Sequence, residues 1–95
     1  MVTAIVLIKC DVHQVPETAQ ALADMADISE VYSVAGEYDL VAIVRVSRHE
    51  DLADVVTGEI GRVPTVTATE TLTAFRAYSR HDLDSLFSIG FADAD

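Results

Sequence analysis

The residues best suited to chemistry lie in one short segment, Gly36, Glu37, Tyr38 and Asp39, between two apolar runs. Glycine permits a left-handed backbone and a close approach of a ligand to the chain. Free backbone N–H groups there would suit a carboxylate, and the carboxylate of Asp39 would suit an ammonium group. An α-amino acid carries both charges, so this segment could bind one.

The same residues have a plainer interpretation, in which they close a hairpin and Asp39 bonds to local amides. The neighbouring carboxylates of Glu37 and Asp39 are also more typical of turn geometry and solvation than of acid–base catalysis. The residues alone favour the hairpin slightly and leave both interpretations open.

Other reactive residue types form no recognisable site. His13, His49 and His81 stand far apart without metal-ligand spacing, and the four glycines make no phosphate-binding loop. Cys10 is the only cysteine, so it forms no internal disulfide, and we expect it to be a small buried hydrophobe. We therefore expect no metal and no cofactor.

The formal net charge of −10 argues against nucleic acid and anionic membranes as direct partners, because the six basic residues are dispersed. The apolar start of the chain has no basic region and meets Lys9 too early for a membrane span of about 20 residues. We expect a protein of the cytoplasm.

The first elements predicted are a strand and a helix. Residues 2–10 carry apolar side chains at both even and odd positions, which predicts a strand buried on both faces. Pro16 suits the first position of a helix, and a narrow apolar stripe follows at helical spacing. The stripe consists of Ala19, Leu22, Ala23 and Ala26.

Residues 28–35 and 39–47 predict two strands of a hairpin around Gly36. A capping box from Ser47 to Glu50 then opens a second helix that ends near Gly61. Its inward stripe is Leu52, Val55, Val56 and Ile60. Residues 65–78 predict a long fourth strand, with its odd-numbered threonines from Thr65 to Thr73 on one face.

The element order βαββαβ predicts a ferredoxin-like α+β fold over residues 1–80, with a four-stranded antiparallel sheet and two helices on one face. Right-handed crossovers place the first and third strands in the centre. Their second apolar face would stay bare, which predicts a homodimer packed sheet to sheet. Residues 81–95 form a C-terminal tail, either a short helix packed on a neighbour or a frayed end.

Two segments resemble the ligand-binding (RAM) domain of the Lrp/AsnC transcription regulators: residues 33–46, SVAGEYDLVAIVRV, and residues 62–71, RVPTVTATET. The resemblance extends over roughly residues 2–78. It implies a dimeric α/β barrel that assembles into higher homo-oligomers and binds a small effector, usually an amino acid. The ligand-binding residues it implies are Ala35, Gly36, Glu37, Tyr38 and Asp39, with Thr69 on the last strand.

Regulators of that family carry an N-terminal helix-turn-helix, whereas this chain begins at the first strand of the ligand-binding domain. We therefore expect a stand-alone, non-enzymatic sensor that regulates transcription through a partner, for instance a full-length Lrp/AsnC regulator. The alternatives are a small monooxygenase of the dimeric α/β-barrel type and a purely structural assembly module. An ACT-type amino-acid-binding domain shares the topology too, but such domains normally regulate an attached enzyme.

Overall fold

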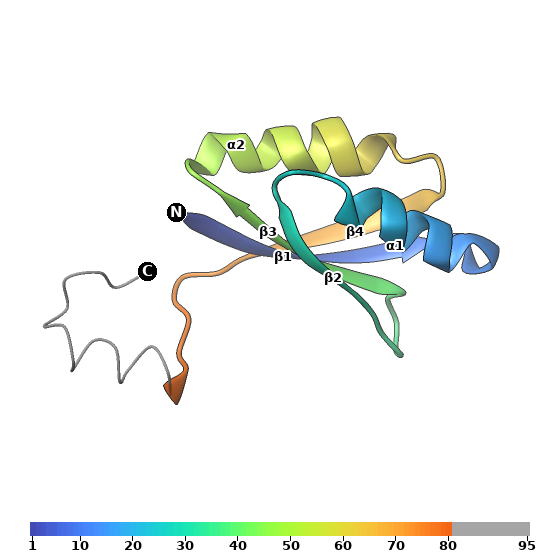
Figure 1. Ribbon diagram of the computed structural model, residues 1–95, viewed down its shortest axis with the longest axis horizontal. Helices are drawn as coiled ribbons and strands as arrows, with labels where there is room; N and C mark the ends of the chain where they lie inside the picture. The colour runs from blue at the N-terminus through green and yellow to red at the C-terminus, as the bar shows by residue number, and fades with distance from the viewer. Residues whose placement is uncertain (81–95) are drawn as a thin grey trace, which may run out of the picture.

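The computed structural model describes residues 1–80 and contains one four-stranded antiparallel sheet with both helices on one face (Figure 1). The strands are β1 (Val2–Cys10), β2 (Ile28–Ser33), β3 (Leu40–Val46) and β4 (Val66–Thr73). The helices are η1 (Val12–Gln14), α1 (Val15–Ala23) and α2 (His49–Ala53), which continues through η2 (Asp54–Glu59) and η3 (Ile60–Arg62). The ferredoxin-like fold is confirmed.

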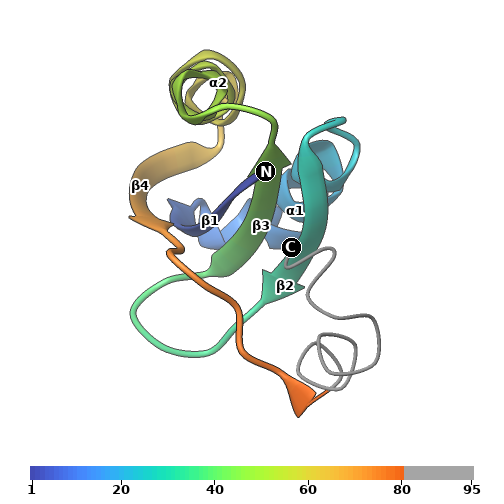
Figure 2. The ribbon, with the colours of Figure 1, turned by 90° about the vertical axis from the view of Figure 1, so that its left-hand side faces the viewer.

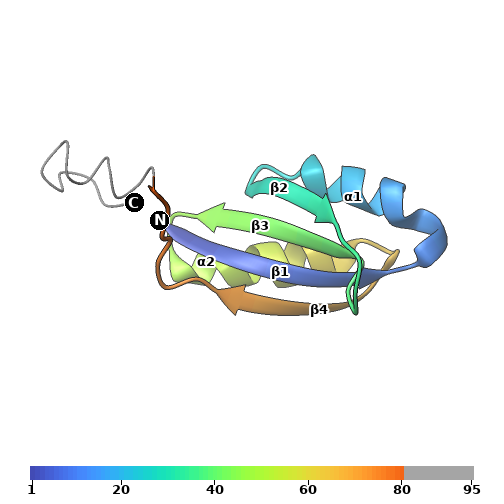
Figure 3. The ribbon, with the colours of Figure 1, turned by 90° about the horizontal axis from the view of Figure 1, so that it is seen from below.

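The strand order is β2-β3-β1-β4, so β1 and β3 occupy the centre as the crossover rule predicts. β1 pairs with β3 along seven residues, from Val2 opposite Val46 to Ile8 opposite Leu40. On its other side β1 pairs with β4. Figure 3 shows the four strands side by side in front of the helices.

The hydrophobic core lies between the sheet and the helices. Even-numbered residues of β1 and β3 point into it because successive side chains of a strand alternate between the two faces. Ala4, Val6 and Ile8 of β1 are fully buried there, with Leu22 of α1 and Ile60 of η3 against them. Cys10 is buried as well, as expected of a small hydrophobe.

Helix α1 covers the sheet with only part of the predicted stripe, since Leu22 is buried and Ala19 packs on the core. Thr18 and Leu22 are buried, whereas Ala23 and Ala26 are exposed. The Thr18 hydroxyl donates to the Gln14 carbonyl and hydrogen-bonds with the hydroxyl of Thr65, which satisfies it inside the core. Small alanines gain little from burial, so they were poor markers of the inward face.

The capping box expected at the second helix is wrong. The N-cap residue is Arg48, which makes no side-chain cap bond. Its guanidinium instead contacts the carboxylates of Glu50 and Asp51. Helical conformation ends at Arg62, one residue after the predicted stop at Gly61.

The last strand is shorter than predicted, because β4 ends at Thr73 rather than at residue 78. Its alternation is also interrupted by a register shift opposite Lys9 and Cys10. Val66 therefore pairs with buried Cys10 and packs on the core, so one uninterrupted threonine face does not form. Beyond the strand, Phe75 is 98% exposed and Tyr78 is 78% exposed.

The open face of the sheet, which is the face away from the helices, carries an apolar patch. Ile5 lies between Ile43 and Leu72 in the register, and Leu7 lies beside Val41. The four residues on the central strands are half-buried and Leu72 is exposed. Viewed from the end, the helices lie beyond the other face of the sheet (Figure 2).

Within residues 1–80, no helix is long and apolar enough to cross a membrane. The tail at residues 81–95, predicted as a short helix or a frayed end, lies outside the described residues.

Candidate ligand-binding turn

The connection between β2 and β3, residues 34–39, is a turn held against the end of β1. The Val34 N–H donates to the Asp39 carbonyl at 3.1 Å, which closes the turn. The Asp39 N–H donates to the Ile8 carbonyl at 2.9 Å. The hairpin is thus attached to the central strand as well as to its own partner strand.

Asp39 makes a second bond to β1 through its side chain. Its Oδ2 accepts the backbone N–H of Cys10 at 2.9 Å. Since the Asp39 N–H also donates to the Ile8 carbonyl, Asp39 bonds to β1 on both sides of Lys9. The amide that Asp39 satisfies belongs to a strand 29 residues away rather than to its own turn. Cys10 lies beneath this contact, and burial raises the pKa of its thiol.

Tyr38 bridges the turn to the far edge of the sheet. Its hydroxyl donates to Glu70 Oε1 on β4 at 2.6 Å, and the ammonium of Lys9 lies 5.5 Å from the centre of its ring. The hydrogen bond to the Glu70 carboxylate favours the neutral phenol and so raises the pKa of Tyr38. Tyr38 and Asp39 are both half-buried, unlike the rest of the turn.

The exposed part of the turn offers unpaired backbone donors. Gly36 has a φ of +135°, a conformation that side-chain-bearing residues rarely adopt. The N–H groups of residues 35–38 donate no hydrogen bond within the part of the chain that the structure describes. A run of N–H groups without an internal acceptor is suited to a carboxylate.

Thr69 lies apart from the other predicted site residues. It pairs with Ile8, whose side chain points into the core, so Thr69 belongs to the helix-covered face of β4. Its neighbour Glu70 occupies the open face and meets the turn. The structure therefore brings residues 35–39 together and leaves Thr69 on the opposite side of the sheet.

Sequence reasoning missed Lys9 and Glu70 as members of this site. Each is a charged residue within an otherwise apolar set of strand residues, and this exception to the pattern was the only sequence feature that could have indicated a role. Their approach to Tyr38 depends on the strand order, which sets β4 beside β1. Within residues 1–80 no group of three His, Cys, Asp or Glu side chains could hold a metal ion.

The sequence of residues 3–83 matches the family model described as the Lrp/AsnC ligand binding domain. The chain belongs to the Lrp/AsnC family. The matched region contains the whole candidate turn and all strands and helices of the described residues, apart from Val2 at the start of β1.

Two similar proteins place this Lrp/AsnC domain among known sequences and structures. The HTH-type transcriptional regulator FL11 of Pyrococcus horikoshii is 32% identical over 75 residues, which cover 79% of this chain and 49% of FL11. The crystal structure of TTHA0845 from Thermus thermophilus is 50% identical with a TM-score of 0.79, and the match covers 84% of this chain and 100% of that one.

A more distant structure shares the fold of this Lrp/AsnC domain. The transcriptional regulator NMB0573 of Neisseria meningitidis, solved as a complex with L-Met, has a TM-score of 0.74 at 10% identity. The match covers 82% of this chain and 52% of NMB0573. The chain thus spans about half the length of the curated relatives it matches.

Proposed function

We propose that this domain binds a small amino acid, or a similar zwitterion, at the turn of residues 35–39. One observation carries the proposal: the N–H groups of residues 35–38 donate no hydrogen bond within residues 1–80, and the same turn ends in the carboxylate of Asp39. The N–H groups complement a carboxylate, and Asp39 complements an ammonium group.

The charges around the turn agree with a ligand that carries both signs. Lys9 brings a positive charge and Glu70 a negative charge next to Tyr38. Asp39 uses Oδ2 for the Cys10 amide, and Oδ1 makes no hydrogen bond within residues 1–80. That oxygen is the acceptor we assign to the ligand's ammonium group.

The family relationship supports a regulatory role. The matching family model is a ligand-binding domain, FL11 is a transcriptional regulator, and NMB0573 was solved with L-Met. We therefore propose that the chain is a non-enzymatic effector sensor of the cytoplasm that acts on transcription through a DNA-binding partner, such as a full-length regulator of the family.

Self-association belongs to the same proposal. The open face carries Ile5, Leu7, Val41, Ile43 and Leu72 next to one another, and a second copy would remove this patch from water. The candidate turn stands at one end of that face, since Tyr38 reaches Glu70 there. A ligand at the turn would therefore lie near the junction of protomers.

Calorimetric titration with each of the twenty amino acids tests the proposal. We expect one amino acid or a related group to bind, and Asp39→Asn to weaken that binding about tenfold or more. Asparagine retains an oxygen for the Cys10 amide, so this variant removes charge without releasing the hairpin. Glu17→Gln, an exposed position on α1, is the matched control.

A bound amino acid whose affinity is the same in Asp39→Asn would contradict the assignment of Asp39. The absence of heat with all twenty, in a protein that remains folded, would refute amino-acid sensing and favour a purely structural assembly module.

A further inference from the structure

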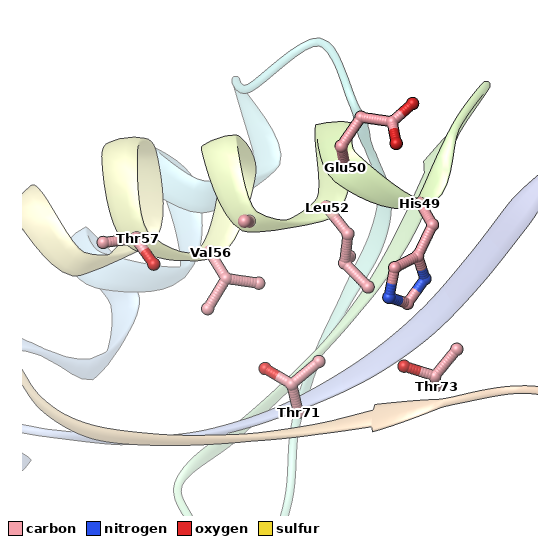
Figure 4. Close-up of a pocket in the computed structure, with 8 residues that line it drawn as sticks. His49, Glu50, Leu52, Val56, Thr57, Thr71 and Thr73 are labelled. Carbon is pink, nitrogen blue, oxygen red and sulfur yellow. The ribbon is translucent and has the colours of Figure 1, made fainter.

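A groove lies on the helix-covered side of the sheet, between the second helix and the edge strand β4. Its volume is about 310 Å³, at the lower end for small-molecule sites. Figure 4 shows His49, Leu52 and Val56 pointing from the helix toward β4, where Thr71 and Thr73 face them. The groove is lined by His49, Glu50, Leu52, Ala53, Val56, Thr57, Thr71 and Thr73.

Four of the polar side chains in this groove have no partner within residues 1–80. The imidazole of His49 and the hydroxyls of Thr57, Thr71 and Thr73 make no hydrogen bond within the described residues. Other threonines of the domain behave differently, since Thr67 donates to the Lys9 carbonyl and Thr18 donates to the Gln14 carbonyl. Several donors and acceptors therefore converge on one hollow without a protein partner.

The helix wall of the groove has a rare geometry. Asp54–Glu59 is a π-helix, and the N–H of Ile60 donates both to the carbonyl of Val55, five residues earlier, and to that of Val56, four residues earlier. Such wide turns are uncommon and frequently occur at functional sites. This one contains Val56 and Thr57, so the distortion falls where the helix faces the groove.

The lining also restricts the charge of a ligand. It contains no Lys or Arg, and its one carboxylate, on Glu50, is paired with the guanidinium of Arg48 at 3.4 Å. Leu52, Ala53 and Val56 give the groove an apolar wall. An anion would find no cationic partner, whereas hydroxyls and an imidazole can both donate to and accept from a neutral polar group.

We propose that this groove is a binding site for a small neutral molecule that has an apolar body and one hydroxyl or amide group. The body lies against Leu52 and Val56, and the polar group bonds to Thr71, Thr73 or His49. This site is separate from the turn at residues 35–39, and the proposal holds whether or not the turn binds amino acids.

Amide NMR of the whole chain, titrated with benzyl alcohol, tests the site. Benzoate and benzylamine serve as charged analogues with the same ring. We expect saturable shifts at millimolar concentration in α2, η2 and β4 with benzyl alcohol, and weaker binding of both charged analogues. Ala53→Leu should lower the affinity about tenfold by filling the groove, whereas Thr67→Val, outside it, should leave the affinity unchanged.

Ala53 is exposed and leucine is a good helix former, so the filled variant should fold. Its amide spectrum verifies that before titration. The proposal is wrong if no saturable shift appears, if the shifts fall on residues 35–39 or the open face, if Ala53→Leu binds equally well, or if benzoate binds as tightly as the alcohol.

Discussion

Asp39 and Tyr38 are neighbours in sequence with different partners in the fold. Asp39 bonds to the Cys10 amide of β1, whereas Tyr38 crosses above Lys9 to reach Glu70 on β4. Together these two side chains attach one hairpin turn to two further strands. The position of these two turn residues therefore depends on the positions of β1 and β4.

The Tyr38 contact has a pH dependence that can be measured. Because the bond to Glu70 raises the pKa of Tyr38, the folded protein holds this proton more tightly than the unfolded chain does. The contribution to stability is therefore complete below the ordinary tyrosine pKa of about 10 and is lost as the pH rises through the folded value. We expect NMR of the tyrosine Cζ carbons to show Tyr38 ionising above that ordinary value.

Glu70→Gln should move the titration of Tyr38 back toward the ordinary value. Tyr32, whose pKa is raised by its own bond to Glu30, is the internal control and should not change. A Tyr38 titration that is the same in Glu70→Gln would contradict the contact.

At the scale of elements, the β2–β3 turn depends on one unusual backbone position. Gly36 has a positive φ of 135°, yet a Cβ added there would meet no atom within 4 Å. Any effect of a substitution must come from backbone strain rather than from collision. Gly58 in η2 offers the matched case, with the same open surroundings and no positive φ.

We expect Gly36→Ala to lower the free energy of unfolding by about 1–3 kcal/mol, because alanine disfavours this φ. Gly58→Ala should instead be neutral or stabilising by up to about 1 kcal/mol, since glycine is a poor helix former. Urea unfolding of both variants measures the difference. Equal stabilities would mean that the turn tolerates a side chain.

A strand or helix could be predicted from the sequence where its inward side chains have a large apolar surface. The Val, Ile and Leu residues at both even and odd positions of residues 2–10 predicted a strand buried on both faces, and its inward residues are indeed buried. The alanines of α1 carried too little area to mark the buried face. The end of β4 was missed because the apolar alternation continues past Thr73, where pairing with β1 stops.

The candidate turn was predictable for a similar reason and only in part. Gly36 and Asp39 are turn residues with recognisable chemistry, so the segment itself stood out. Lys9 and Glu70 come from strands far away in sequence, and only the register of the sheet brings them to Tyr38. No local pattern in a single sequence indicates contacts between residues that lie so far apart in the chain.

At the scale of the whole molecule, the exposed apolar surface is the dominant feature. It includes the patch of the open face and, after β4, the aromatic rings of Phe75 and Tyr78. Contiguous patches of this kind are typical of surfaces that bind another protein. The proposed homodimer would cover the open face.

Ile43→Arg tests that interface, because it places a charge in the middle of the open face. We expect light scattering to give a dimer or larger species for the unchanged chain and a smaller species for the variant. Ala23→Arg, exposed on the outer side of α1, is the control and should keep the mass of the unchanged chain. An unchanged chain that is monomeric would refute sheet pairing.

The strand order also bears on how the chain folds as it leaves the ribosome. β1 is synthesised first, yet its two partners are β3 and β4, and the β4 pairing runs to Thr73. One edge of β1 therefore has no partner until β3 is synthesised, and the other edge has none until β4 is synthesised. Contacts of such long sequence separation form slowly. Until β4 emerges, the nascent chain carries an apolar strand with at least one unpaired edge, which makes β1 a natural binding segment for a chaperone.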